Sequence, residues 1–280
     1  MKMKIDRDRV KKTFREYTAC YDISDEKIKL KIDHTYRVAE LCERIAKSEN
    51  MEKEDVELAW LMGMLHDVGR FEQLREYGTF VDAQSVDHAA LGADILFGGE
   101  ETLGGEKLPH GGSIRDYVDS DEEDALLELA IRVHSAYRIP NQLFERAEKL
   151  CNILRDADKI DILRVNAEIP LEEIYNTTTE ELRNAEVTET VMKSFYEHHA
   201  VLRSLKKTPV DHVVGHCSLV YELVFPESLR IVMEQGYLKR LLQFQSENPT
   251  TREQFRCLQT EMTEYLEELG MSFCIDVSGR

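Results

Sequence analysis

The 280-residue sequence lacks several features that mark other classes of protein. It contains no apolar run as long as the roughly 20 residues that a membrane-spanning helix needs. The segment from Met1 to Val10 is charged and has no apolar centre, so we expect neither a signal peptide nor a membrane anchor. The six cysteines show no paired spacing, which is typical of a protein in a reducing compartment. Together these absences predict a cytoplasmic protein.

Positive charge is also scarce. The chain has 36 lysine and arginine residues against 54 aspartate and glutamate residues, a formal net charge of -18. This balance repels polyanionic nucleic acids and anionic membrane surfaces, so we expect neither as a partner. A small phosphorylated substrate remains compatible with it, because a few local cations or metal ions can bind one. The sequence carries no signature of an oligomeric state.

The alternation of apolar and polar residues that marks β-strands is scarce, and there is no internal repeat or low-complexity tract. Helical spacing prevails instead, which predicts an all-α protein. We expect a short N-terminal helix over 1–24 and a helical, ligand-bearing domain over 25–165. A helical C-terminal extension is expected over 166–280.

Two stretches interrupt the helical patterns. Glycine, proline and acidic residues gather at about 98–122 and predict a flexible insertion. This insertion is either a lid over the site or an idle surface loop. In the extension, the pattern over Leu219–Gln245 is interrupted at Pro226.

The adjacent pair His66-Asp67 ends an apolar helical run and is the most informative feature of the sequence. Burying an imidazole and a carboxylate side by side costs free energy unless hydrogen bonds, a counter-charge or a metal ion compensates. A divalent metal ion would compensate both groups. The ordinary alternative is a helix-ending aspartate beside a hydrogen-bonded histidine.

Four further polar side chains fall on the apolar faces of other predicted helices, where solvated residues are not expected. One of them, His34, precedes Val38, Leu41 and Ile45 at helical spacing, so we expect its imidazole to point into the core. A second one, His88, is followed at helical spacing by Gly92, which lets a neighbouring helix approach closely. The four residues are His34, His88, His134 and Asp158.

In order and in helical context, these residues resemble the HD superfamily of metal-dependent phosphohydrolases, which is named for its His…His-Asp…Asp signature. The resemblance covers about residues 25–165 and implies an HD-like helical bundle. His88 and His134 match two further histidines that occur in members binding two metal ions. The metal ligands that the resemblance implies are His34, His66, Asp67, His88, His134 and Asp158.

The resemblance also divides these ligands between two ions. The first ion would be held by the residues of the signature itself. Asp67 would bridge it to a second ion, held in addition by His88 and His134. Imidazole and carboxylate ligands without thiolates suit manganese, iron, cobalt, nickel or zinc. Several imidazoles in one site favour these metals over magnesium.

Two such ions can share a hydroxide formed from bound water and hold the phosphoryl oxygens during an in-line displacement. No nucleophilic side chain is then needed. The resemblance thus implies hydrolysis of a small phosphate ester or nucleotide, as a phosphomonoesterase or a phosphodiesterase. Cyclic di-GMP is disfavoured as the substrate, because the segment from His134 to Pro140 lacks the Gly-Tyr-Pro of that branch.

Cationic side chains near the ligands are candidates for binding the phosphate. Arg70 lies three residues after Asp67, where related members carry a basic residue. Lys159 directly follows Asp158, and Arg37 lies one helical turn beyond the first histidine. A solvated surface position is the alternative for Lys159 and Arg37. The predicted catalytic residues are Asp67, Arg70, Lys159 and Arg37.

The remaining histidines receive no function from the sequence. His212 and His216 have the spacing of the His-Glu-x-x-His motif of zinc proteases, but Val213 occupies the place of the catalytic glutamate. A separate metal site there and ordinary surface or core histidines both remain open. The other three are His110, His198 and His199.

The interpretation that these residues favour is a metal-dependent phosphohydrolase. Two alternatives remain open. One is a di-iron oxygenase, because the superfamily includes an enzyme of inositol oxidation with a similar ligand set. The other is a non-catalytic sensing or binding module, although a decayed site usually loses a ligand.

Overall fold

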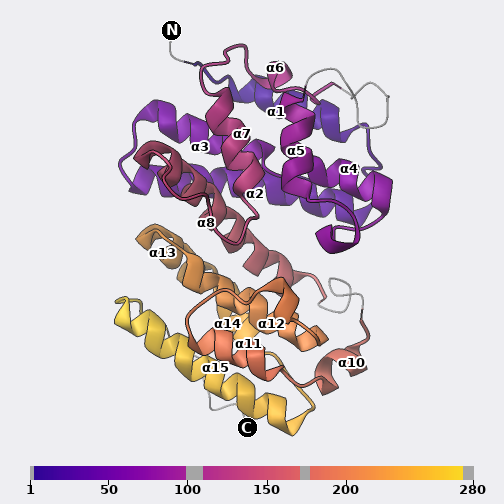
Figure 1. Cartoon of the computed structure of the whole chain (residues 1–280), viewed down its shortest axis with the longest axis vertical. Helices are drawn as coiled ribbons and strands as arrows, with labels where there is room; N and C mark the ends of the chain where they lie inside the picture. The colour runs from indigo at the N-terminus through magenta and orange to yellow at the C-terminus, as the bar shows by residue number, and fades with distance from the viewer. Residues whose placement is uncertain (1–2, 99–109, 171–176, 274–280) are drawn as a thin grey trace. The chain divides into compact units, whose positions relative to one another are not determined.

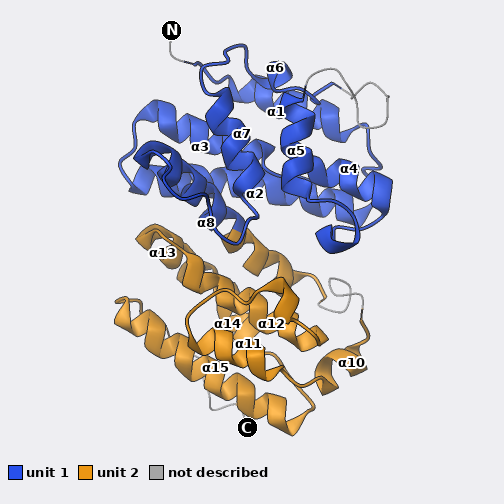
Figure 2. Ribbon diagram, in the orientation of Figure 1, with its two compact units in different colours: residues 1–158 blue, residues 159–280 orange. Residues whose placement is uncertain are grey.

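The computed structural model of the protein describes residues 3–98, 110–170 and 177–273, and every regular element in these ranges is a helix (Figure 1). The predicted all-α class is confirmed. The chain divides into two compact units, Met1–Asp158 and Lys159–Arg280 (Figure 2), and the division falls inside helix α8. Across the described ranges, none of the helices combines the length and apolarity that crossing a bilayer requires.

The first unit packs its helices pairwise around an apolar core. Helix α2 packs against α3, α4 against α5, and α5 against α7. The helices are α1 (Arg7–Thr18), α2 (Glu26–Ser48), α3 (Lys53–Leu65), α4 (Val68–Tyr77), the 3-10 turn η1 (Asp82–Gln84), α5 (His88–Phe97), α6 (Ile114–Tyr117), α7 (Asp124–Val133) and the first part of α8 (Glu145–Glu168).

Two of these helix pairs touch through their backbones. A Cβ atom added to Gly63 of α3 would lie 2.5 Å from the Cα of Ala39 in α2. A Cβ atom added to Gly69 of α4 would lie 2.3 Å from the carbonyl oxygen of His88 and 2.6 Å from the amide nitrogen of Gly92. Only glycine permits these approaches. They bring the predicted ligand-bearing segments within reach of one another.

Helix α1 closes one side of this core. Its buried face carries Val10, Phe14 and Tyr17, and the Tyr17 hydroxyl donates to the carbonyl oxygen of Val68 at 3.2 Å. Of the predicted insertion, residues 99–109 lie outside the described residues. The part that is described contains α6, which packs against α1.

The second unit is also helical. It comprises the end of α8, α10 (Thr179–Asn184), α11 (Glu189–Tyr196), η3 (Arg203–Leu205), α12 (Pro209–Cys217), η4 (Ser218–Glu222), α13 (Pro226–Gln235), α14 (Tyr237–Leu242) and α15 (Pro249–Glu268).

The helical pattern predicted over Leu219–Gln245 is broken at two places, whereas the sequence predicted a single break at Pro226. Pro226 begins α13, where its missing amide hydrogen costs nothing. A second break lies at Gly236, whose φ of 71° is left-handed and separates α13 from α14. The stretch therefore forms three short elements.

Candidate metal centre

The structure brings the six predicted ligands together in the first unit. Each comes from the end of a helix or from the inward face of one. Five of them are at most 4% exposed, and the side chain of Asp158 is 13% exposed. They lie in α2 (His34), at the C-terminal end of α3 (His66), just before α4 (Asp67), at the first position of α5 (His88), at the C-terminal end of α7 (His134) and in α8 (Asp158).

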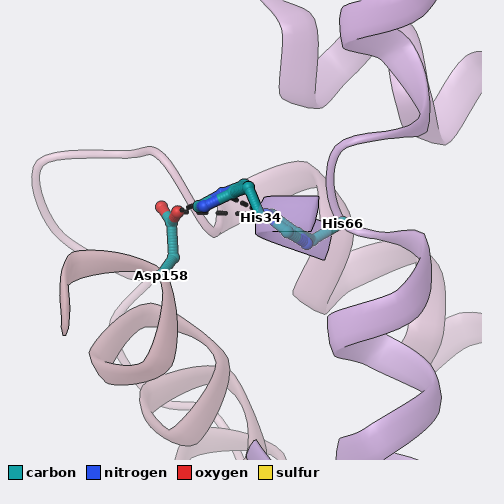
Figure 3. Close-up of side chains that lie close together, drawn as sticks. All are labelled: His34, His66 and Asp158. Carbon is teal, nitrogen blue, oxygen red and sulfur yellow. Dashed lines mark hydrogen bonds and ion pairs between the residues drawn. The ribbon is translucent and has the colours of Figure 1, made fainter. Parts of the chain in front are cut away.

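One group of donor atoms is formed by two imidazoles and a carboxylate. The Nε2 atoms of His34 and His66 lie 3.3 Å apart. Oδ1 of Asp158 lies 3.2 Å from the first and 3.8 Å from the second. Figure 3 shows these three side chains pointing toward one another from separate segments of the chain. The spacing is compact enough for a single cation to reach all three.

A second pair of imidazoles lies on the other side of Asp67. The Nε2 atoms of His88 and His134 are 3.1 Å apart. Oδ1 of Asp67 lies 3.5 Å and 3.7 Å from them, respectively. Oδ2 of the same carboxylate lies 3.5 Å from Nε2 of both His34 and His66. The two oxygens of Asp67 thus face different pairs of imidazoles.

The outer nitrogens of three rings have acceptors that fix the tautomer. Nδ1 of His66 donates to the carbonyl oxygen of Gly63 at 2.7 Å, and Nδ1 of His134 donates to that of Ile131 at 2.7 Å. Nδ1 of His88 is 2.9 Å from Oδ2 of Asp82. Because these acceptors hold no proton, the rings carry theirs on Nδ1 and leave the Nε2 lone pair bare. Such outer contacts orient histidine ligands in metal sites.

The protonation states also suit a cation. Burial lowers the pKa of His88 and of His134 to about 4, and it lowers the pKa of His66. These three imidazoles are therefore neutral near pH 7, which is the form that binds metal. Burial alone would raise the pKa of Asp67, but the surrounding basic groups, Lys31 first among them, together outweigh it and hold that pKa well below its usual range. Neutral imidazoles and ionised carboxylates together fit a divalent transition metal.

Two functional residues escaped the sequence analysis. Nζ of Lys31 lies 2.7 Å from Oδ2 of Asp67. The lysine is three residues before His34, so helical spacing could have placed it on the same face. Asp82 joins His88 to Arg70, whose Nη1 donates to Asp82 Oδ1 at 2.9 Å. Asp82 lies in the α4–α5 connection, where no periodicity marks it.

The predicted cations occupy different surroundings. Arg70 lies at the centre, with Nε 3.6 Å from Oδ1 of Asp67 and Nη1 also donating to the carbonyl oxygen of Phe80 at 2.7 Å. The Phe80 ring lies 5.6 Å from Nζ of Lys31 and 5.8 Å from Cζ of Arg70. Phe80 is half-buried and lies beside both cations.

The other two predicted cations are partly exposed and neighbour the ligands in sequence. Arg37 lies in α2 one turn beyond His34, and Lys159 follows Asp158 in α8. Lys159 is also the first residue of the second unit.

Comparison with known protein families identifies the domain that carries this site. Residues 32–166 match the family model of the HD domain. This part of the chain is an HD domain, the domain of a superfamily of metal-dependent hydrolases that bind divalent ions. Neither a search of curated proteins nor a search of solved structures produced a match.

Proposed function

We propose that the HD domain is a cytoplasmic phosphohydrolase that uses two divalent transition-metal ions to cleave a small phosphate ester or nucleotide. One observation carries the proposal. The two carboxylate oxygens of Asp67 face separate pairs of imidazole nitrogens, which is the arrangement that a bridging ligand requires.

The donor atoms divide into two sets around that bridge. When bound, such ions lower the pKa of water and polarise phosphoryl oxygens. The first set consists of His34, His66, Asp158 and Oδ2 of Asp67, and the second consists of His88, His134 and Oδ1 of Asp67.

The protein's own cations supply the phosphate contacts. Lys31 and Arg70 approach opposite oxygens of Asp67, so a phosphoryl group bound beside this carboxylate lies within reach of an ammonium and a guanidinium group. Both donors bind phosphate oxygens well. Arg37 and Lys159 are further candidates for the outer part of the substrate. Phe80 offers an apolar ring next to Lys31 and Arg70, where the organic part of an ester can pack.

A substrate screen tests the proposal. The full chain, reconstituted separately with manganese, iron, cobalt, nickel, zinc and magnesium, is incubated with phosphomonoesters, nucleotides and cyclic nucleotides, and phosphate release or ester cleavage is measured. We expect turnover of at least one class with a transition metal.

Two variants give the screen its control. Asp67→Ala should abolish turnover, whereas Asp121→Ala changes an exposed acid and should retain it. Turnover that survives Asp67→Ala would refute the proposal. So would a protein with both ions bound that cleaves none of the substrates.

A further inference from the structure

Basic side chains gather at one place in the C-terminal unit, around helix α12. Arg203 lies in η3 and is exposed, and Lys206 follows in the connection to α12. His212 and His216 lie one turn apart on α12 and are both partly buried. The sequence analysis assigned none of them a function.

The amine of Lys206 lies directly on the backbone of α12. A Cβ atom added to Gly215 would be 2.4 Å from Cε and 2.5 Å from Nζ of this lysine. Any side chain at position 215 would therefore displace the amine. Gly215 follows His212 by three residues, so the two positions are neighbours on the helix surface. The charge of Lys206 acts on both His212 and His216, which places the amine near both imidazoles.

Burial and the neighbouring basic groups lower the pKa values of three of these side chains. Burial, and next the charge of Arg203, lowers the pKa of Lys206 to about 8. Burial and the nearby Lys206 lower the pKa of His212, and they lower that of His216 well below its usual value. Each shift reflects first the cost of burying a charge and second the cost of adding a proton beside another basic group.

The carboxylate of Asp211 acts on Lys206 and His212, but its oxygens accept hydrogen bonds from other groups. Asp211 is fully buried and accepts hydrogen bonds from the amide and hydroxyl of Thr188 at 2.8 Å and 2.6 Å. It also accepts from the amides of Lys207 and Thr208 at 2.8 Å and 2.9 Å. Across the described ranges, the amine of Lys206 has neither a hydrogen-bond acceptor nor a carboxylate within ion-pair distance.

We propose that Arg203, Lys206, His212 and His216 form a binding site for a phosphate oxyanion, separate from the metal centre of the HD domain. A tetrahedral dianion has enough acceptor oxygens for a guanidinium, an ammonium and two imidazole donors. Its charge offsets the repulsion between Arg203 and Lys206.

Binding also has a proton signature. The oxyanion stabilises the protonated forms of Lys206, His212 and His216, so it raises their pKa values and takes up protons near neutral pH.

The test follows the histidine rings by NMR during a titration with inorganic phosphate. The full chain, loaded with zinc and labelled at histidine, reports each ring separately, and the signals of His212 and His216 are assigned with His→Gln variants. We expect saturable shifts of both signals with phosphate and none with chloride at equal ionic strength. Phosphate bound at the HD domain moves other histidine signals, so the two sites are read independently.

Variants decide the outcome. Lys206→Gln should weaken the titration at least tenfold, and Lys207→Gln, which changes the exposed neighbour, should leave it unchanged. Arg203→Gln should weaken phosphate binding severalfold. Because Arg203 is exposed and lies outside the core, this loss is not explained by misfolding. Unaltered titrations in both Lys206→Gln and Arg203→Gln, or equal shifts with chloride, would overturn the proposal. Adenosine monophosphate and glycerol 3-phosphate, titrated in parallel, distinguish free phosphate from a phosphorylated molecule as the ligand.

Discussion

Asp82 is the residue through which the proposed second metal site can be tested without touching a ligand. Its carboxylate lies 2.9 Å from Nδ1 of His88 and 2.9 Å from Nη1 of Arg70. Asp82→Asn keeps the size of the side chain but replaces one acceptor oxygen with a donor NH₂ group. If the amide accepts from Arg70, its NH₂ faces His88 and favours the tautomer with the proton on Nε2, which cannot bind metal. If it accepts from His88 instead, Arg70 loses an acceptor.

The expected magnitude follows from the hydrogen bond that is lost. The side chain of Asp82 is only 13% exposed. A hydrogen bond to a charged group of this kind contributes about 1.5–3 kcal/mol. Loss of an outer contact to a histidine ligand typically weakens metal affinity about 10–100-fold, or about 1.4–2.8 kcal/mol. The two figures agree. We therefore expect the second ion to bind about 10–100-fold more weakly and the first ion to be nearly unaffected.

Metal titrations against a competing chelator, followed by elemental analysis, measure both affinities. Asp87→Asn is the matched control, because Asp87 caps the same helix by accepting from the amides of Ala89 and Ala90. Asparagine caps helices equally well. Two unchanged affinities in Asp82→Asn, or equal losses at both sites, would refute the assignment of His88 to a second ion oriented by Asp82.

Five other perturbations test the metal centre and the packing around it. Asp67→Ala should remove both ions and all turnover, while His88→Ala should empty mainly the second position; elemental analysis that finds full occupancy in Asp67→Ala would exclude the bridge. Lys31→Met should keep both ions but lower kcat/KM about 10–100-fold through loss of a charged phosphate contact, and an unchanged kcat/KM would remove Lys31 from the site. Gly69→Ala should cost about 1–3 kcal/mol of unfolding free energy by overpacking against α5, and an unshifted urea midpoint would contradict this. In the metal-free protein, His88 and His134 titrate near pH 4 instead of ~6.5 in an unfolded chain, so the unfolded state binds more protons and stability should fall by a few kcal/mol as the pH falls between these values. Equal urea midpoints near pH 7 and near pH 5 would count against it.

The fold class and the meeting of the six side chains were both accessible from the sequence. Helical spacing places His34 and Asp158 on inward faces whatever the surroundings. The pair His66-Asp67 stands where an apolar run ends, so its burial could be expected. Periodicity alone thus carries a large part of the site.

Contacts between segments could not be predicted in the same way. Asp82 lies in a loop, and its role depends on how the α4–α5 connection folds back on His88 and Arg70. Lys31 looks like any solvated lysine until the packing of α2 on α3 brings it to Asp67. Partners of loops and of long flexible side chains are tertiary properties, which local patterns do not encode.

The second unit shows the same limit at the level of helices. The apolar pattern over Leu219–Gln245 continues through Gly236, but the left-handed backbone there ends one helix and begins another. Periodicity counts apolar positions and is insensitive to a change of helix axis. A glycine inside a helical pattern is compatible with either outcome.

His66 and His134 have the same relation to two different helices. Each follows the last residue of its helix, α3 or α7, and its ring donates to a carbonyl oxygen of the final turn. Fraying of that turn would release the ring from the tautomer that binds metal. By thermodynamic reciprocity, an ion bound at Nε2 holds the helix end closed by the same free energy with which the closed end favours the ion. Amide hydrogen exchange in the final turns of α3 and α7 should therefore slow when metal binds, so the backbone itself reports occupancy without any substrate.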